Sequence, residues 1–203
     1  MWRAIWRAAV PCTCLLATTS CDDYVNYDCS VLPPAASSPY ILPWTVGHAY
    51  TAYPHAARDT GRQAYAMDLL MPIGTPILAI SEGLVVAVEE SFLDTDHIKG
   101  HENFVIVKNP DANVTLYVHL TLLGAAVQVG DTVQQGDLIG SSGDSGNSTQ
   151  PHTHLEVLQS CSVGPPLEYS VIRQCLTIPL AFRNASPVSS CGLRYGITYT
   201  AQP

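Results

Sequence analysis

Short apolar runs separated by turns dominate the middle of the chain. Between about residues 63 and 158, β-branched and aliphatic residues alternate with turns that are centred on Gly. The predicted strands are residues 64–70, 76–80, 84–88, 104–107, 114–120, 138–140 and 152–158. Short strands at this spacing are typical of a sandwich or barrel, and no window keeps a helical period over three turns. The pattern therefore predicts an all-β fold.

The turns between these runs are rich in Gly. Gly130-Asp131 and Gly136-Asp137 stand six residues apart around Thr132-Val133, and three more Gly follow between residues 140 and 146. Because Gly adopts positive φ without steric cost, this density favours tight hairpins. We expect the strands to be joined by short Gly-rich hairpins.

The first twenty residues have the pattern of a secretory signal. Arg3 and Arg7 precede an apolar stretch over residues 8–17, and small polar residues follow. No later apolar run reaches the ~18–20 residues that a membrane-spanning helix needs. We expect an extracytoplasmic protein, located in the periplasm or cell envelope or secreted.

The remaining chain divides into three segments by composition. Residues 21–45 are rich in Asp, Ser, Pro and Tyr without a sustained period, which predicts a linker or extended arm. Residues 46–160 hold the predicted strands. Residues 161–203 form a Pro- and Cys-containing extension, in which 176–182 and 193–200 are candidates for further strands pinned by disulfides.

The cysteines allow two interpretations. Cys12 and Cys14 fall inside the predicted signal, and five Cys remain, at positions 21, 29, 161, 175 and 191. Residues 16–21 loosely resemble a bacterial lipobox, in which Cys21 would be lipidated and attach the protein to a membrane. Four Cys would then be left for two disulfides. In the alternative, the protein is secreted and Cys21 pairs with Cys29.

The charge balance excludes one class of partner. Nine Lys and Arg stand against seventeen Asp and Glu, for a net charge of −8. Removal of the signal would take two Arg with it and leave the chain more acidic. Binding to a phosphate backbone needs a basic surface, so we expect no nucleic-acid partner. The sequence gives no indication of an oligomeric state.

The strongest chemical signal is the segment Pro151-His-Thr-His-Leu-Glu-Val157. Residues two apart in a strand share one face, so His152, His154 and Glu156 are expected to project together. Two imidazoles about 7 Å apart can have separate roles, in which one binds a metal and the other exchanges a proton with a water beside that metal. Alone, the segment would be explained better by two ordinary surface or core histidines.

Two further residues strengthen the metal interpretation. Asp68 lies inside an apolar run at residues 65–71, where a carboxylate needs a cation or metal as partner. His119 lies in a second strand-like run at 115–120. Separately, a capping carboxylate and a hydrogen-bonded core imidazole would explain them. Together with the paired histidines on neighbouring strands, they predict a zinc site.

With these residues, the chain resembles a known family, the lysostaphin-type, LytM-like zinc endopeptidases, over about residues 55–157. The matching blocks are, in chain order, Tyr65-Ala-Met-Asp68, Met71-Pro-Ile-Gly-Thr-Pro-Ile77, Glu82-Gly83-Leu-Val-Val86, Asn103-Phe-Val-Ile-Val107, Tyr117-Val-His119-Leu120, Val129-Gly-Asp-Thr-Val-Gln-Gln-Gly136, Ile139-Gly-Ser-Ser-Gly-Asp-Ser-Gly146 and Pro151-His-Thr-His154. The resemblance implies an antiparallel β-sandwich or open barrel, a Zn²⁺ cofactor, and hydrolysis of peptide bonds in the stem or cross-bridge peptides of peptidoglycan.

The resemblance also implies roles for individual residues. Zinc would be held by an upstream His, by Asp68 and by His154. His152 would act as general base, and His119 would hydrogen-bond the developing oxyanion or position the water. Apart from the resemblance, Glu156 shares a strand face with His154 and would orient a metal ligand without touching the metal. The alternative for Glu156 is a solvated strand residue.

One departure affects the first ligand. Many family members carry that His four residues before the Asp, and position 64 is Ala here. A longer-spaced version of the block points upstream to His55, with His48 in reserve. If neither His reached the metal, the chain would be a catalytically silent member that acts as a wall-binding or amidase-activating module.

Three other motifs are set aside. Gly143-Asp-Ser-Gly146 matches the nucleophile motif of trypsin-like proteases, but the residues around it do not fit that family. His101-Glu102 begins a metalloprotease H-E-x-x-H, yet position 105 is Val. Residues 129–140 resemble a lipoyl or biotinyl carrier hairpin but supply no Lys at its tip.

Overall fold

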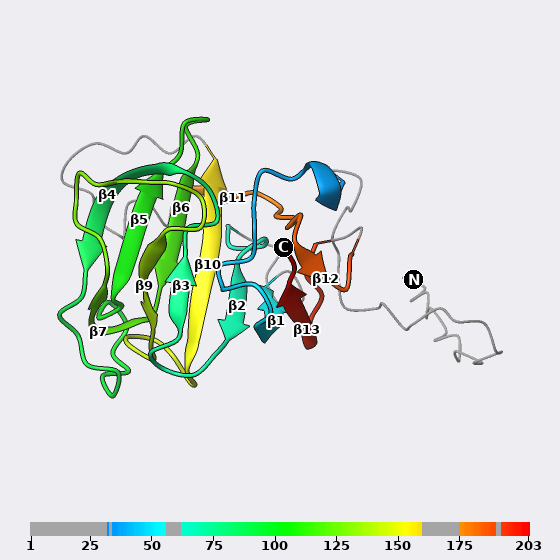
Figure 1. Cartoon of the computed structure of the whole chain (residues 1–203). Coiled ribbons are helices and arrows are strands. Elements are labelled where there is room, and N and C mark those ends of the chain that lie inside the picture. Colours follow the sequence, from blue (N-terminus) through cyan, green and yellow to red (C-terminus); the bar gives the residue numbers. More distant parts are fainter. Residues whose placement is uncertain (1–31, 33, 56–61, 160–174, 190–191) are drawn as a thin grey trace, which may run out of the picture.

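The strands of the described residues form two antiparallel sheets (Figure 1). The computed structural model describes residues 32, 34–55, 62–159, 175–189 and 192–203. Within these residues the helical content is the 3-10 turn η2 (Ala35–Ser37) and the 3-10 conformation of His55, and none of it is a helix that could cross a membrane. The all-β prediction is confirmed. The predicted signal and Cys21 lie outside the described residues.

The larger sheet has the strand order β12-β13-β1-β2-β10-β6-β5-β4-β8, with β11 also paired to β10. Its strands are β1 (Ala49–Pro54), β2 (Met67–Leu70), β4 (Gly83–Glu89), β5 (Phe104–Lys108), β6 (Val114–Val118), β8 (Thr132–Val133), β10 (His152–Gln159), β11 (Leu176–Thr177), β12 (Ala185–Ser186) and β13 (Ile197–Ala201). The smaller sheet contains β3 (Pro76–Leu78), β9 (Leu138–Ser142) and β7 (Leu120–Ala125), in that order.

The main core lies between the two sheets, and the strand period of two supplies it. On β10, Leu155 and Val157 face this core, whereas His152, His154 and Glu156 face the other side. Ile77 and Ile139 from the smaller sheet belong to the same buried cluster. Figure 1 shows the smaller sheet lying over the half of the larger sheet that contains β4, β5, β6 and β10.

The opposite face of the larger sheet carries a second apolar cluster. Its buried members are Ile106, Val114, Leu116, Val118 and Leu158, from β5, β6 and β10. Every residue of β6 is buried, so this strand is enclosed on both faces. Burial on both faces explains why β6 is apolar at every position except Thr115 and does not alternate.

Strand β6 ends where the sequence pattern predicted it to continue. Residues 114–120 were expected to form one strand, but His119 adopts a φ of +63°. This left-handed conformation turns the chain out of the larger sheet, and Leu120 begins β7 in the smaller one. The prediction of one strand was wrong because the turn contains no Gly or Pro to mark it.

Segments on either side of the predicted strands also join the fold. Tyr40, Leu42 and Trp44 of the N-terminal arm are buried in the main core, and Leu78 N–H of β3 donates to Pro43 O at 2.9 Å. Near the C-terminus, β13 pairs with β1 and buries Tyr199. These contacts make both segments part of the same hydrophobic core.

The cysteines are mostly beyond what the structure describes. Cys175 is disulfide-bonded, and the other six Cys fall in the segments that are not described. The disulfide connectivity therefore stays a prediction.

Candidate metal centre and active site

Strand register brings the predicted site residues together on one face of the larger sheet. Asp68 on β2 pairs directly with His154 on β10, and His154 in turn pairs with Val118 on β6. Residues directly opposite each other in an antiparallel pair point to the same face with Cβ atoms ~4.5–5.5 Å apart. His55 follows the last residue of β1, next to β2.

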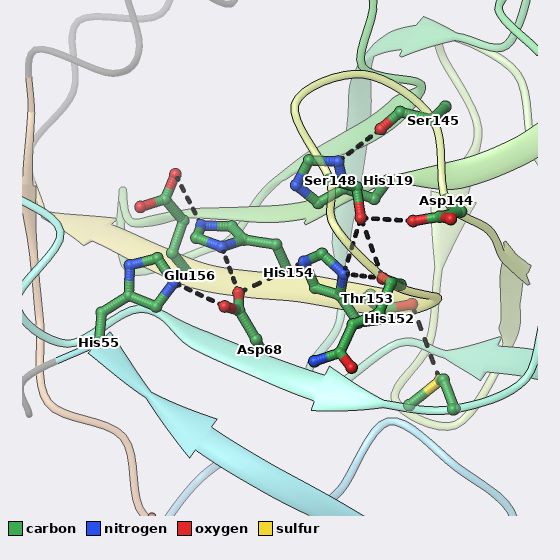
Figure 2. Close-up of polar contacts among 12 residues, drawn as sticks. His55, Asp68, His119, Asp144, Ser145, Ser148, His152, Thr153, His154 and Glu156 are labelled. Carbon is green, nitrogen blue, oxygen red and sulfur yellow. Dashed lines mark hydrogen bonds and ion pairs between the residues drawn. The ribbon is translucent and has the colours of Figure 1, made fainter. Parts of the chain in front are cut away.

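Three of these side chains form a compact cluster. His55, Asp68 and His154 each offer one ligand atom, and the three atoms lie within 4.8 Å of one another. His55 Nε2 lies 3.0 Å from Asp68 Oδ2, and His154 Nδ1 lies 2.9 Å from Asp68 Oδ1. Figure 2 shows the two rings on either side of the carboxylate. Two imidazoles and one carboxylate form a donor set that suits zinc.

The electrostatics of the cluster fit a cation. Burial alone would raise the pKa of Asp68, but hydrogen bonds with His154 and His55 outweigh it and hold that pKa well below its usual range. Burial alone would lower the pKa of His154, but Asp68 and Glu156 raise it instead. The cluster thus favours a positive charge at His154 Nδ1. A divalent cation bound by the three residues would supply positive charge at the same place.

His48, the second candidate for the first metal ligand, does not belong to this cluster. His48 is exposed and precedes β1, and among the described residues it is not part of any group that could hold a metal. Its backbone carbonyl accepts hydrogen bonds from Trp44 Nε1 and from the N–H of Ala201. The geometry therefore brings His55, rather than His48, to Asp68.

His152 and His119 lie beside the cluster, with ring centroids 4.6 Å apart. His152 Nδ1 is 2.8 Å from the carbonyl of Gln150 and His119 Nδ1 is 2.7 Å from the carbonyl of Ser145. Since a carbonyl only accepts, each neutral ring carries its proton on Nδ1. Nε2 of each ring is left with a lone pair, and that of His152 lies 3.6 Å from Asp68 Oδ1.

Both rings are neutral at neutral pH. Burial, and then the neighbouring His152 and His154, lower the pKa of His119 to about 3. Burial also lowers the pKa of His152, although Asp68 opposes the shift. Two neutral imidazoles beside a candidate metal site provide groups that can accept a proton from water.

A cleft opens onto these groups. Its volume is about 210 Å³, and all five predicted site residues contribute to its wall. The other lining residues are Gln63, Glu102, Asn147, Ser148 and Thr149.

The groups that hydrogen-bond the rings of His119 and His152 were not predicted from the sequence. Ser148 Oγ bonds Asp144 Oδ1 at 2.5 Å and lies 3.2 Å from His152 Nδ1, as Figure 2 shows. In the sequence, only its position four residues before His152 could have indicated that Ser148 contacts this ring. The carbonyls that fix the tautomers could not be found at all, because every residue has one.

The serine-protease motif is structural. The Ser145 hydroxyl donates to Leu120 O at 2.8 Å and accepts the N–H of Asn103 at 3.0 Å. It is fully buried and pairs with no histidine through its side chain. His101 also lies outside the cluster, because it pairs with Asp96 at 2.7 Å and stacks on Phe92. Rejection of both motifs agrees with this geometry.

Comparison with known proteins decides the family. The model of peptidase family M23 matches residues 62–165, just over half of the 203 residues. The chain belongs to peptidase family M23. Its resemblance to lysostaphin-type enzymes is thereby confirmed. His55 precedes the matched segment, whereas Asp68, His119, His152 and His154 lie within it.

Two curated relatives indicate what M23 proteins of this kind do. Glycyl-glycine endopeptidase ALE-1 of Staphylococcus capitis is 35% identical over 120 residues, which cover 59% of this chain and 31% of the relative. Peptidoglycan DD-endopeptidase ShyA of Vibrio cholerae is 34% identical over 91 residues, which cover 45% of this chain and 19% of the relative. The chain thus matches less than a third of either relative's length.

A solved structure supports the fold. Pseudoalterin, a deep-sea M23 metalloprotease, superimposes with a TM-score of 0.51 and 19% identity over 74% of this chain and 81% of its own. At this identity the likeness concerns the fold alone. The roles of the five site residues stay predictions.

Proposed function

We propose that this M23 protein is a zinc-dependent endopeptidase that hydrolyses peptide bonds in the stem or cross-bridge peptides of peptidoglycan. The observation that carries the proposal is the cluster of His55, Asp68 and His154 beside two neutral imidazoles. The substrate class rests on the M23 relatives named as a glycyl-glycine endopeptidase and a peptidoglycan DD-endopeptidase.

Zinc would be held by His55, Asp68 and His154. When bound, it supplies an electrophile that polarises the scissile carbonyl and lowers the pKa of a water at the site. The donor set and the buried carboxylate suit this ion.

His152 is assigned as the general base. Its Nδ1–H is anchored on the carbonyl of Gln150, so Nε2 is free to accept a proton from the attacking water. Once charged, the same ring can return that proton to the leaving amine. Because the ring is buried beside the cluster, it moves the proton without reorienting.

His119 is assigned to positioning the water. Its proton is on Nδ1 and is donated to Ser145 O, so neutral Nε2 accepts hydrogen bonds rather than donating them. A neutral ring of this tautomer cannot stabilise an oxyanion as a donor. Of the two roles that the resemblance implies, water positioning therefore fits better.

The place of action follows from the same proposal. Peptidoglycan lies outside the cytoplasm, so the predicted signal at residues 1–20 would direct the protein to the periplasm, the cell envelope or the medium. Lipidation of Cys21 would attach it to a membrane. The alternative is a silent, wall-binding or amidase-activating module, which would follow if neither His55 nor His48 reached the metal. The contact of His55 with Asp68 supports the catalytic proposal, and bound zinc distinguishes the two.

The test uses the chain without its predicted signal, incubated with purified peptidoglycan. Released fragments are identified by mass, and bound zinc is counted by elemental analysis. His154→Ala should abolish release and zinc binding. His152→Ala should lower the rate about 10²–10⁴-fold and keep the zinc, as expected for a base.

The matched control is His101→Ala, which removes an imidazole that pairs with Asp96 outside the cluster. It should release the same fragments as the unchanged chain. Equal products from the unchanged chain and His154→Ala, or products from neither, would contradict the proposal.

A further inference from the structure

Two buried polar atoms on β10 have no hydrogen-bond partner. They are His154 Nε2 and Glu156 Oε1, and they are the only buried side-chain nitrogen or oxygen atoms of the described residues in this condition. The same two atoms lie 3.9 Å apart. A buried polar atom without a partner is costly. Because these two atoms face each other, one explanation should account for both of them.

The strand explains why they face each other. His154 and Glu156 are two residues apart on β10 and point to the same side of the sheet. Beyond Glu156 this face is apolar, because Leu116 on β6 pairs opposite it and Leu158 follows on β10. Glu156 is only 1% exposed. Among the described residues its sole ion-pair contact is with His154.

Glu102, the other buried glutamate of the described residues, has a structural role that can be compared with Glu156. Glu102 lines the cleft at the cluster, and its two oxygens accept the backbone N–H groups of Gly100 and Asn147 at 3.0 and 3.4 Å. Glu102 thereby joins two loops. Glu156 Oε1 accepts no backbone N–H, so loop anchoring does not account for it.

An imidazole binds a metal through one nitrogen and needs its proton on the other. The Nδ1 atom of His154 faces Asp68 within the cluster, and Nε2 faces Glu156. An acceptor at Nε2 keeps the proton there and leaves the Nδ1 lone pair toward the cluster. The carboxylate also increases the electron density that the ring offers.

We propose that Glu156 is a positioning residue that accepts the Nε2–H of His154 and so fixes this ring as a metal ligand through Nδ1. The inference rests on the proposed zinc site. Glu156 is neither one of the three residues of the cluster nor one of the residues that line the cleft. Its effect is therefore on metal affinity and ring orientation rather than on chemistry directly.

The test measures zinc affinity by competition with a chromophoric chelator, with Zn²⁺ as the probe. Glu156→Met removes the acceptor at similar size and should weaken zinc binding about 10–100-fold. Glu156→Gln keeps an acceptor oxygen without the charge and should fall between this variant and the unchanged chain. Glu102→Gln is the matched control, because it removes the charge of the other buried glutamate, which accepts loop N–H groups instead of facing a metal ligand.

A second readout reports the ring directly. In the zinc-loaded protein with ¹⁵N-labelled histidine, the Nε2–H proton of His154 should give a protected, downfield signal. This signal should move upfield or exchange away in Glu156→Met and persist in Glu102→Gln. Thermal unfolding in a chelator checks that each variant folds, and Glu156→Gln carries the test if Glu156→Met does not.

The outcomes separate the two proposals. If the unchanged chain binds zinc and the Glu156 variants match Glu102→Gln in affinity and in the ring signal, the role of Glu156 is wrong and the zinc site stands. If the unchanged chain takes up no zinc, the proposed function fails and this inference fails with it.

Discussion

At the scale of single residues, the site depends on which nitrogen of each histidine carries the proton. Backbone carbonyls of Ser145 and Gln150 hold Nδ1–H of His119 and His152, and Asp68 faces Nδ1 of His154. The sequence predicted the residue types and their shared face, because strand alternation is regular. It could not predict the tautomers, since carbonyl positions follow from the fold.

Burial of neutral His119 predicts acid sensitivity of the fold. The folded pKa of about 3 lies below the ordinary value of 6.5, so the unfolded chain takes up this proton first as pH falls. Stability from this group is complete above pH 6.5 and is lost on the way down toward pH 3. Between about pH 7.5 and pH 5 the loss from His119 should be about 2 kcal/mol.

Urea unfolding in the presence of a chelator measures this effect. His119→Asn removes the titrating group, and Asn tolerates the positive φ at this position better than most residues. The variant should lose about 2 kcal/mol less than the unchanged chain between the two pH values. An equal loss in both proteins would show that His119 is not the group responsible.

At the scale of elements, the register of β1, β2, β10 and β6 places the ligands, and the 143–148 turn supports the two neutral rings. The sequence identified β2, β5 and β10 because their runs are strongly apolar or alternate cleanly. It missed β1, whose Ala-Tyr-Thr-Ala-Tyr-Pro sequence carries a weak pattern. It also missed the break between β6 and β7, where His119 occupies a conformation usually left to Gly.

The 143–148 turn should tolerate no side chain at Gly146. Its φ is +71°, and a Cβ there would lie 2.5 Å from Glu102 Cγ and 2.7 Å from Glu102 N. Gly146→Ala must therefore move the turn that supplies the Ser145 carbonyl to His119. We expect a lower melting temperature and at least about a 10-fold loss of peptidoglycan hydrolysis, the scale on which misplaced catalytic groups act.

Gly74→Ala is the matched control for that variant. Gly74 has a similar φ of +84°, but no atom beyond its two neighbours in the chain lies within 4 Å of the position that an added methyl group would take. The substitution should cost only about 1–2 kcal/mol of stability and leave the rate unchanged. Equal rates for the two variants would show that the Gly146 contact does not matter for the site.

At the scale of the whole molecule, segments outside the family match complete the fold. The match begins at residue 62, yet β1, which leads into His55, precedes it and is paired on its outer side by β13. The sequence predicted the peptidase-like centre from ordered blocks. It named candidate strands in the C-terminal extension but did not predict that the arm and the extension share this core, because their apolar runs are short and lack the ordered blocks.

This integration predicts that the C-terminal extension stabilises the protein. Tyr199 of β13 is buried, and its hydroxyl accepts the N–H of Arg194 at 2.8 Å. Tyr199→Ala should lower the free energy of unfolding by about 3–5 kcal/mol. Tyr199→Phe keeps the ring and should cost about 1 kcal/mol. Denaturant unfolding measures both, and an unaffected Tyr199→Ala would mean that the extension does not contribute to the core.

The proposed chemistry depends on His55, Asp68 and His154 holding one divalent ion between them. Calorimetric titration of the metal-free chain with Zn²⁺, repeated for His55→Ala and His48→Ala, measures this binding. We expect one zinc per chain in the unchanged protein and in His48→Ala. Binding should be at least about 100-fold weaker in His55→Ala, as expected when a direct ligand is lost. Undiminished binding by His55→Ala, or no binding by the unchanged chain, would show that these three residues do not form a zinc site.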